Sequence, residues 1–438
     1  MTSRKNILAH NICLFILTLL SAVVIFYKFP HVPQNLSYDE TEFARLARSL
    51  DQTGYMPYSP IATGHATLYF YIILVSMKLF GLTVFGLRFP AAVFGVLGTS
   101  IFYLVMRQIF SKEYIHKMIP SAYLEHHDYF MPSLLTFTFL STRWYFNFAR
   151  FSFEATFLLF LELVSIYFFL KYKKSLNWKY LIGSGLAAGL AYNSYTPGRL
   201  FSLMPLIFIA AEIRSIRNLR FAMFQPLLTF IIPFIIIIAP LTLYFSVHPD
   251  IRINQLSYVT NDKMQVGEKI EFGIQNIQKT LLMFHVAGDM NGRHNYPGKP
   301  TLNPLIGLFF AVGLVFAIRK IQLFENAFFL FYFVLSLLPM MLTYPWENPN
   351  ILRSFTAIPA IIFFVGNGVL LIFKLPIKPK ILICGLVIIF YAAGAYDLRT
   401  YFVYQAYTVF PSAFEIDPLL FPGYVKGMYQ WLYQFDKI

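Results

Sequence analysis

Apolar stretches of about 20 residues recur along the whole chain, and they limit its possible folds more than any other feature. About 20 apolar residues are what an α-helix needs to cross the hydrocarbon core of a bilayer. In lipid, only helices and closed β-barrels satisfy all their backbone hydrogen bonds, and these stretches lack the alternating pattern of barrel strands. With 57% hydrophobic and 13% charged residues, the sequence therefore predicts an all-α polytopic membrane protein.

The short loops between the apolar stretches carry clusters of lysine and arginine, which are expected on the cytoplasmic side of a membrane. These clusters are Arg107/Lys112/Lys117, Lys171/Lys173/Lys174/Lys179, Arg214/Arg217/Arg220, Arg319/Lys320 and Lys374/Lys378/Lys380. About eleven transmembrane helices, with the N-terminus in the cytoplasm, place every cluster on that side. The predicted spans are 7–27, 86–108, 129–147, 154–170, 180–195, 199–213, 222–246, 303–318, 325–343, 355–373 and 380–396.

One further apolar stretch, residues 65–81, is almost long enough to cross the membrane. Counting it as a span would move all five basic clusters to the outside. We therefore expect it to form a juxtamembrane helix in the outer interface, with a slightly short span as the alternative. Residues 7–27 are followed by no cleavage site of small residues and are interpreted as a retained anchor.

This topology creates a first outer loop, 28–85, and a long outer loop, 247–301. Residues 1–396 are predicted to form one transmembrane domain, and residues 397–438 an extracytoplasmic tail or the start of a small appendage. The net charge of +14 lies in short loops, which favours anionic lipid or phosphate rather than nucleic acid as a partner. Cys13 and Cys384 both lie in apolar stretches, so neither a disulfide nor a cysteine metal site is expected.

An acidic segment, "LSYDETEFARLARSLDQTGY" at residues 36–55, follows the first span. Ser37 and Glu40 match a capping box, and the apolar residues behind them recur at helical spacing, which predicts an amphipathic surface helix. Asp39 and Glu40 would lie in its first turn, where the helix dipole stabilises an acid by roughly 0.3–1 kcal/mol. Composition alone leaves helix capping and catalysis equally open for this pair.

Six motifs occur in a fixed order along the chain. They are "YDETEFARLARSLDQTG", "LRFPAAVFGVLG", "ARFSFEAT", "GLAYNSYTPGRLF", "GDMNGRHNYPGKP" and "NPNILRSFTAIPA". Together they resemble the GT-C fold membrane glycosyltransferases, in particular the bacterial and archaeal group related to protein O-mannosyltransferases and lipid A aminoarabinose transferases. The resemblance covers nearly the entire membrane region. It implies an inverting transfer of a sugar from a polyprenyl-phosphate donor to an acceptor, on the extracytoplasmic face of a bacterial or archaeal plasma membrane.

The resemblance also implies roles for individual residues. A phosphate leaving group gains negative charge as the anomeric C–O bond breaks, so arginines beside its oxygens would stabilise the transition state. Asp39 matches the family's general base, with Glu40 mainly as its helix-capping partner, and Arg88 matches the family's phosphate-binding arginine. The other candidates are Tyr195, Arg199, Arg293, His294 and Arg353 for the donor phosphate or sugar, and Glu154 and Arg150 for positioning the acceptor.

No divalent metal is expected, because the two donors Asp289 and His294 match no ligand spacing. The alternatives are a lipid or sugar transporter or flippase, an oligosaccharide-transferring enzyme of the same fold, and a non-catalytic assembly partner. Transporters tend to carry ionisable groups near the bilayer midplane, whereas nearly all acids of this chain map to outer boundaries. Glu162 lies inside a predicted span and has no assigned role.

Overall fold

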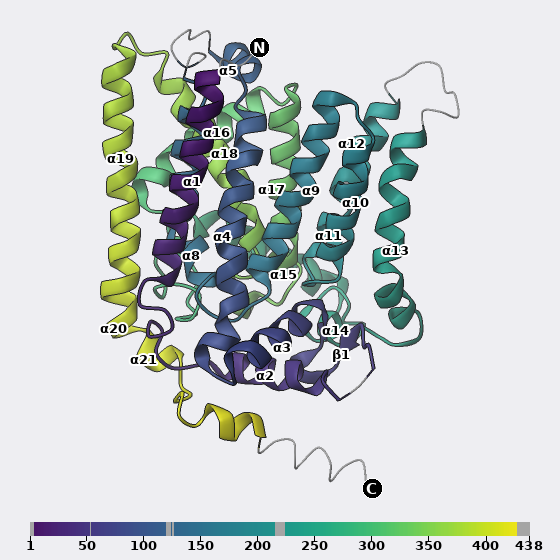
Figure 1. The fold of residues 1–438 in the computed structure, drawn as a ribbon. Coiled ribbons are helices and arrows are strands. Elements are labelled where there is room, and N and C mark those ends of the chain that lie inside the picture. The colour runs from purple at the N-terminus through teal and green to yellow at the C-terminus, as the bar shows by residue number, and fades with distance from the viewer. Residues whose placement is uncertain (1–3, 53, 120–123, 125–126, 215–223, 427–438) are drawn as a thin grey trace, which may run out of the picture.

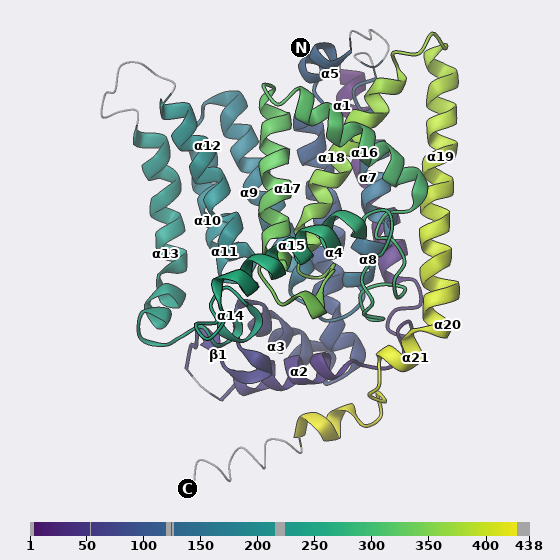
Figure 2. The ribbon, with the colours of Figure 1, turned by 180° about the vertical axis from the view of Figure 1, so that it is seen from behind.

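The computed structural model describes residues 4–52, 54–119, 124, 127–214 and 224–426, and almost all of its regular structure is helical (Figures 1 and 2). The helices of the bundle are α1 (Arg4–Phe26), α4 (Val84–Ile109), α7 (Phe130–Ser141), α8 (Arg143–Phe148), α9 (Ala155–Ser175), α10 (Lys179–Tyr192), α11 (Gly198–Phe201), α12 (Leu203–Arg214), α13 (Gln225–Val247), α16 (Pro304–Arg319), α17 (Phe324–Met341), α18 (Ile358–Ile372) and α19 (Pro379–Arg399). Arg217 and Arg220 of the basic clusters lie outside the described residues.

Shorter elements connect these helices. They are α2 (Tyr38–Ser49), α3 (Leu68–Phe80), α5 (Lys112–Met118), α14 (Ile251–Leu256), α15 (Val266–Met283), α20 (Ala406–Thr408), α21 (Phe410–Ala413), the 3-10 turns η1 (Ile61–Thr63), η3 (Pro345–Glu347) and η4 (Phe355–Ala357), and the π-helical turn η5 (Thr400–Gln405). Two-residue strands, β1 (Tyr58–Ser59) and β2 (His65–Ala66), pair antiparallel with Tyr58 opposite Ala66.

Each of the eleven predicted spans coincides with a helix or a pair of consecutive helices. Seven helical stretches of the described chain are long and apolar enough to cross a membrane: Asn6–Phe26, Val84–Ile109, Ala155–Ser175, Gln225–Val247, Phe324–Met341, Phe355–Ile372 and Pro379–Thr408. The other four predicted spans are α7 with α8, α10, α11 with α12, and α16, which are shorter or interrupted. Thr142, for example, is extended (φ −69°, ψ 124°) and separates α7 from α8.

The buried share of each helix shows whether it lies at the centre or at the edge of the bundle. α18 is almost wholly buried and packs against α16, whereas α13 buries little of its surface. Figure 1 shows α13 and α19 at opposite edges of the bundle. Glycines allow the close packing in the centre: a Cβ on Gly313 of α16 would lie 1.7 Å from the Phe364 carbonyl oxygen of α18. The protein is thus an integral, multi-pass, all-α membrane protein, as the sequence predicts.

The two ends of the bundle differ in character. One end, here called the α2–α3 end, carries α2, α3, the β-hairpin and α14, and Figure 2 shows α15 crossing the bundle near it. α3 lies there beside α2, across the bundle rather than along it (Figure 1), as predicted for residues 65–81. The opposite end, here called the α5 end, carries the connections from α4 to α7, α9 to α10 and α18 to α19. Three of the five basic clusters lie there, mostly in the adjoining ends of the helices.

The last predicted span, residues 380–396, is shorter than the helix in the structure. It was expected to stop at residue 396, but the helical path continues from Pro379 to Thr408. Aromatic side chains explain the extension, because Tyr401 is fully buried and packs its ring against Phe146. Ile416 then pairs with Leu36 through two backbone hydrogen bonds of 2.9 Å. Residues 397–416 are therefore packed onto the transmembrane domain rather than separated from it.

Candidate active site

Helix α2 holds Asp39 and Glu40 in its first turn. Ser37 caps the helix: its hydroxyl accepts a hydrogen bond from the Glu40 N–H at 3.3 Å, and its own N–H donates to the Glu40 carboxylate at 3.0 Å. This is the capping box that the sequence predicts. The apolar face of α2 is buried as expected, with Phe43 and Leu46 almost inaccessible to solvent. The two acids consequently face different environments.

Glu40 is fully buried and forms an ion pair with Arg88. The Arg88 guanidinium donates to both carboxylate oxygens, from Nε at 2.7 Å and from Nη2 at 2.9 Å, and also to the carbonyl oxygens of Pro33 and Asn35 at 2.6 and 2.7 Å. The Ser152 N–H donates to Glu40 at 3.0 Å. Arg88 thus joins α4 to the segment that precedes α2, and it contacts none of the cavities described below.

Arg150 is also buried, and it binds the end of α1. Its guanidinium donates to the carbonyl oxygens of Val24, Ile25, Tyr27 and Val32. The last carbonyls of a helix have no partner within the helix, and a cation is favoured at that end of its dipole. The guanidinium also lies 4.9 Å from the centre of the Phe402 ring. Arg150 therefore holds the end of α1 and lines none of the cavities described below, so its role in positioning the acceptor stays a prediction.

A polar cavity of about 410 Å³ lies beside Asp39. It is enclosed by α2, the loop 289–294, residues 346–353 and the first turn of α14. Five of the residues predicted from sequence line it together: Asp39, Tyr195, Arg293, His294 and Arg353. Glu40, Arg88, Arg150 and Glu154 do not line it, and Arg199 lines only the apolar cavity beside it. The structure thus brings together half of the predicted set from segments far apart in sequence.

Asp39 and Arg293 form an ion pair in the wall of this cavity. Their side chains keep 41% and 25% of their surface exposed, so both groups remain accessible to a ligand. Arg293 is carried by the loop 288–300, which Asp289 organises: the carboxylate accepts from the N–H groups of Asn291 and Ile351 at 2.8 and 3.0 Å. His294 lies against the same carboxylate at 2.9 Å. Asp289 and His294, the two donors that match no metal-ligand spacing, therefore hold the loop in place.

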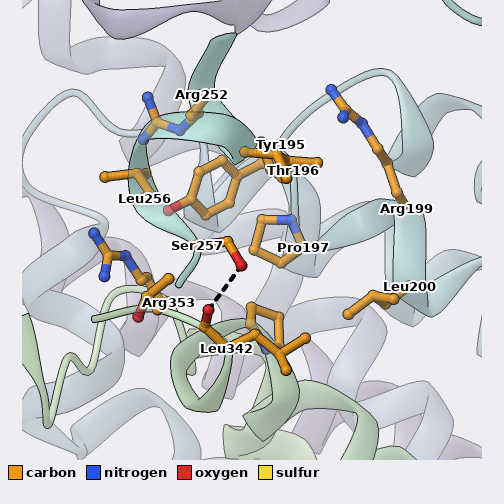
Figure 3. A pocket seen from close by; sticks show the side chains of 13 residues that line it. Tyr195, Thr196, Pro197, Arg199, Leu200, Arg252, Leu256, Ser257, Leu342 and Arg353 are labelled. Atoms are coloured by element: carbon orange, nitrogen blue, oxygen red, sulfur yellow. Dashed lines mark hydrogen bonds between the residues drawn. The ribbon is translucent and has the colours of Figure 1, made fainter. Parts of the chain in front are cut away.

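An apolar cavity of about 220 Å³ adjoins the polar one (Figure 3). Leu200, Leu256, Pro339 and Leu342 form much of its wall, and Tyr195, Arg252 and Arg353 line both cavities. Figure 3 shows Arg252 and Arg353 on one side of this space and Arg199 on the other. Arg199 pairs with Asp250 and lies 4.7 Å from the centre of the Phe245 ring. Two arginines thus stand at the junction of a polar and an apolar compartment.

Arg353 has an unused donor at this junction. Its Nη2 binds Glu347, whereas its Nη1 is buried without a hydrogen-bond partner among the described residues. A buried N–H group that lacks a partner costs free energy, so such a group in a cavity wall favours a ligand that accepts hydrogen bonds. An anion placed there would also find Arg252 nearby.

Sequence reasoning missed Arg252 and His65, the side chain that contacts it. His65 connects Glu154 to Arg252: its Nδ1 lies 2.6 Å from Glu154 Oε1, and its Nε2 lies 2.7 Å from Arg252 Nη1. A guanidinium can only donate, so the contact with Arg252 is a hydrogen bond only when the His65 ring is neutral. Glu154, expected to position the acceptor, instead belongs to this buried chain. The only local signal was a histidine after Gly64 in the first outer loop.

The buried position of His65 predicts a dependence of stability on pH. Burial, and then the positive charge of Arg252, lower the pKa of His65 below its ordinary value of 6.5. A histidine with a lowered pKa contributes its full stability above the ordinary value and loses it as the pH falls below that value. We expect the thermal unfolding midpoint to decrease between about pH 7.5 and about pH 5.5. His65→Gln should flatten this decrease, and an unchanged slope in that variant would contradict the assignment.

A second cleft, of about 530 Å³, lies on the other side of Asp39. Asp39 and Arg293 line both this cleft and the polar cavity. Its remaining wall includes Tyr38 from α2 and Ser412 and Glu415 from the C-terminal segment. Ser412 and Glu415 follow the helical extension and belong to residues 397–416, which pack onto the transmembrane domain. The Asp39–Arg293 pair therefore separates an inner polar cavity from a more open cleft.

Within the part of the chain that the structure describes, no three of the His, Cys, Asp and Glu side chains come together as a cluster that could hold a metal ion. Cys13 and Cys384 are both unpaired by disulfides.

No protein-family model matches the chain, and no curated protein matches it in sequence. Solved structures do match. ArnT from Cupriavidus metallidurans in the apo state is similar over 91% of this chain and 77% of that chain, with a TM-score of 0.52 and 12% identity. The same enzyme bound to undecaprenyl phosphate matches over 94% and 75%, with a TM-score of 0.50 and 13% identity. The oligosaccharyltransferase of Archaeoglobus fulgidus, in complex with zinc and sulfate, covers 92% of this chain and 53% of that chain, with a TM-score of 0.48 and 12% identity.

The protein has the GT-C fold. The similarity extends over nearly the whole chain, so the GT-C assignment that six short motifs predicted is confirmed at the level of architecture. In this GT-C protein, five of the six motifs contribute residues to the cavities at the α2–α3 end: residues 38–54, 149–156, 189–201, 288–300 and 348–360.

Proposed function

We propose that this GT-C protein is an inverting glycosyltransferase that moves a sugar from a polyprenyl-phosphate donor to an acceptor at the α2–α3 end, on the extracytoplasmic side of the membrane. The observation that carries the proposal is the meeting of two cavities, one apolar and one polar, at Arg252 and Arg353. A lipid-phosphate sugar has the same order of parts: an apolar tail, an anionic phosphate and a polar sugar.

The donor fits this arrangement part by part. The first isoprene units would lie in the apolar cavity against Leu256 and Leu342, and the phosphate would lie between Arg252 and Arg353. The unpaired Nη1 of Arg353 supplies a donor for a phosphate oxygen. The sugar would then occupy the polar cavity, with its anomeric carbon toward Asp39. In the solved structures of similar fold, one ArnT structure contains undecaprenyl phosphate, a molecule of this chemical class.

The acceptor would enter through the cleft that shares Asp39 with the polar cavity. Its hydroxyl oxygen attacks the anomeric carbon from the face opposite the phosphate, a new C–O bond forms, and the bond to the phosphate oxygen breaks. The hydroxyl proton passes to the Asp39 carboxylate, and polyprenyl phosphate leaves with one more negative charge. Arg252 and Arg353 stabilise that charge as it develops. Arg293, which pairs with Asp39 in the structure, can turn toward the same phosphate from the cavity wall.

Positioning would supply much of the rate enhancement. Asp39 is fixed by the first turn of α2, Arg252 by His65 and Glu154, and Arg293 by the loop that Asp289 organises. Groups held in place in this way lose little freedom when the substrates bind. Buried pairs such as Glu40 with Arg88 support the site without contacting the substrates.

The proposal predicts that Arg353→Gln weakens the binding of polyprenyl phosphate by about tenfold or more, because a charge-assisted hydrogen bond to the phosphate is lost. Arg252→Gln should act in the same direction. The measurement is equilibrium binding of radiolabelled polyprenyl phosphate to the purified protein in nanodiscs.

Lys263→Gln is the matched control. Lys263 is an exposed cation in the same loop as Arg252, residues 247–301, and it lines neither cavity. It removes the same charge at the same end of the bundle. An equal loss of affinity in Arg353→Gln and Lys263→Gln would show that only the overall charge attracts the lipid. Full affinity in both arginine variants would place the phosphate elsewhere.

A further inference from the structure

A separate polar cavity, of about 580 Å³, lies at the α5 end, opposite to the candidate active site. Three helices of the bundle and α5 enclose it. α4 packs between α1 and α9 (Figure 1), and the cavity lies where the ends of these helices meet. Its wall contains four basic side chains against two acidic ones: Arg107, Lys112, Lys171 and Lys174 against Glu113 and Asp128.

The acidic side chains do not neutralise the basic ones. Asp128 is buried and already bound, because it accepts a hydrogen bond from Asn6 at 3.2 Å and lies 3.4 Å from His10 Nε2. Glu113 is exposed in the first turn of α5, where the helix dipole favours an acid. Asp128 therefore already has partners, and the single carboxylate of Glu113 cannot offset four basic side chains.

The basic side chains have few partners in the protein. Arg107, Lys112 and Lys174 make no ion pair and no side-chain hydrogen bond with any residue that the structure describes. Lys171 contacts the Tyr167 ring at 5.6 Å from its centre. Arg107 and Lys171 are both half-buried, so part of their hydration is already lost. Partly dehydrated cations without a counter-charge favour the binding of an anion.

The position of the cavity along the helices indicates the kind of anion. Leu104, Phe110 and Tyr167 form an apolar part of the wall, and Leu104 and Tyr167 each lie one turn before a basic residue of the same helix, Arg107 or Lys171. Cations one turn beyond an apolar membrane span lie at the depth of lipid headgroups. A molecule with an anionic headgroup and an apolar tail can therefore bind here by its headgroup while its tail stays in the bilayer.

We propose that this cavity binds the phosphate of an anionic phospholipid headgroup, with Arg107 and Lys171 as its ligands and Lys112 and Lys174 at the mouth. The helix dipole also favours cations at the C-terminal ends of α4 and α9, which accounts for each basic residue alone. It does not account for their convergence, together with Lys112 of α5, on one cavity. The inference does not depend on the sugar transfer proposed above.

The test compares two charge-matched double variants at the same end of the bundle. Arg107→Gln/Lys171→Gln removes two charges from the cavity, whereas Lys378→Gln/Lys380→Gln removes two exposed charges from the start of α19. Purified protein in neutral detergent is titrated with fluorescent phosphatidylglycerol. We expect about tenfold or greater loss of affinity in the first variant and little change in the second. Phosphatidylcholine should bind wild-type protein much more weakly.

Two further measurements identify the source of the phosphate and exclude misfolding. Inorganic phosphate, even in excess, should displace little of the bound lipid, because it lacks the apolar part of a lipid. Complete displacement of the lipid by inorganic phosphate would show a site for free phosphate and overturn the lipid assignment. Arg107→Lys, which keeps the charge, should retain binding. Equal losses in both double variants, or none in either, would overturn the cavity as the binding site.

Discussion

Asp39→Asn is expected to lower sugar transfer by about 100-fold or more while the protein keeps most of its affinity for polyprenyl phosphate. Asparagine has nearly the shape of aspartate and can still contact Arg293, but it cannot take a proton from the attacking hydroxyl. Asp39 lines the polar cavity and the open cleft but not the apolar cavity, so its loss should spare recognition of the lipid. Single-turnover transfer and donor affinity, measured on the same nanodisc preparation, separate the two effects.

Asp51→Asn provides the control for this variant. Asp51 follows the other end of α2 and forms an exposed ion pair with Lys78, so the same chemical change there should leave transfer close to the wild-type rate. Wild-type transfer by Asp39→Asn would exclude Asp39 as the base. A parallel fall in transfer and in donor affinity would indicate instead that Asp39 helps to hold the donor.

Arg88→Ala is expected to destabilise the protein by about 3–5 kcal/mol, because it leaves the fully buried Glu40 carboxylate without its counter-charge. It also leaves the carbonyl oxygens of Pro33 and Asn35 without donors. Arg88→Lys should recover only part of this loss, since an ammonium group cannot bind both carboxylate oxygens in the same fork geometry. Reversible unfolding in detergent, followed by intrinsic fluorescence, gives the free energies.

A double-mutant cycle isolates the ion pair. Arg88→Ala combined with Glu40→Gln should be less destabilised than the sum of the two single variants, because the second change removes the uncompensated charge. Simple additivity would contradict the pairing. The resemblance to GT-C enzymes implies that Arg88 binds the donor phosphate. A loss of donor affinity in correctly folded Arg88→Lys, with stability unchanged, would favour that role.

The local structure of α2 was predictable because its signals lie within a few residues. Ser37 and Glu40 are three positions apart, and the apolar stripe behind them has helical spacing, so the cap and the buried face follow from the sequence alone. The spans were predictable for a similar reason, because the length of an apolar stretch determines whether its helix can cross a bilayer. Their internal breaks were not, because the turn at Thr142 leaves no strong local signal.

The partners of the arginines were not predictable from sequence. Arg88, Arg150, Arg199 and Arg353 all occur in motifs near helix ends, and nothing local distinguishes one that binds a buried acid from one that lines a cavity. That difference depends on how each helix is rotated and on contacts with distant segments. Arg252 and His65 are 187 positions apart, and their contact exists only once α14 lies against the first outer loop. Resemblance to a family predicted the fold and five of the residues that line the polar cavity. The partners of the other site residues depend on how the helices pack.

The most direct test of the central claim is the mass of the products that purified protein forms from an isotopically labelled polyprenyl-phosphate sugar in the presence of native membrane extract. We predict free polyprenyl phosphate together with an acceptor that is heavier by a single labelled sugar, and about 100-fold less of both products with Asp39→Asn. Donor that stays intact, or that merely crosses the bilayer of a vesicle unchanged, would contradict sugar transfer and favour a flippase. An acceptor that gains a whole preassembled glycan would instead identify an oligosaccharide-transferring enzyme.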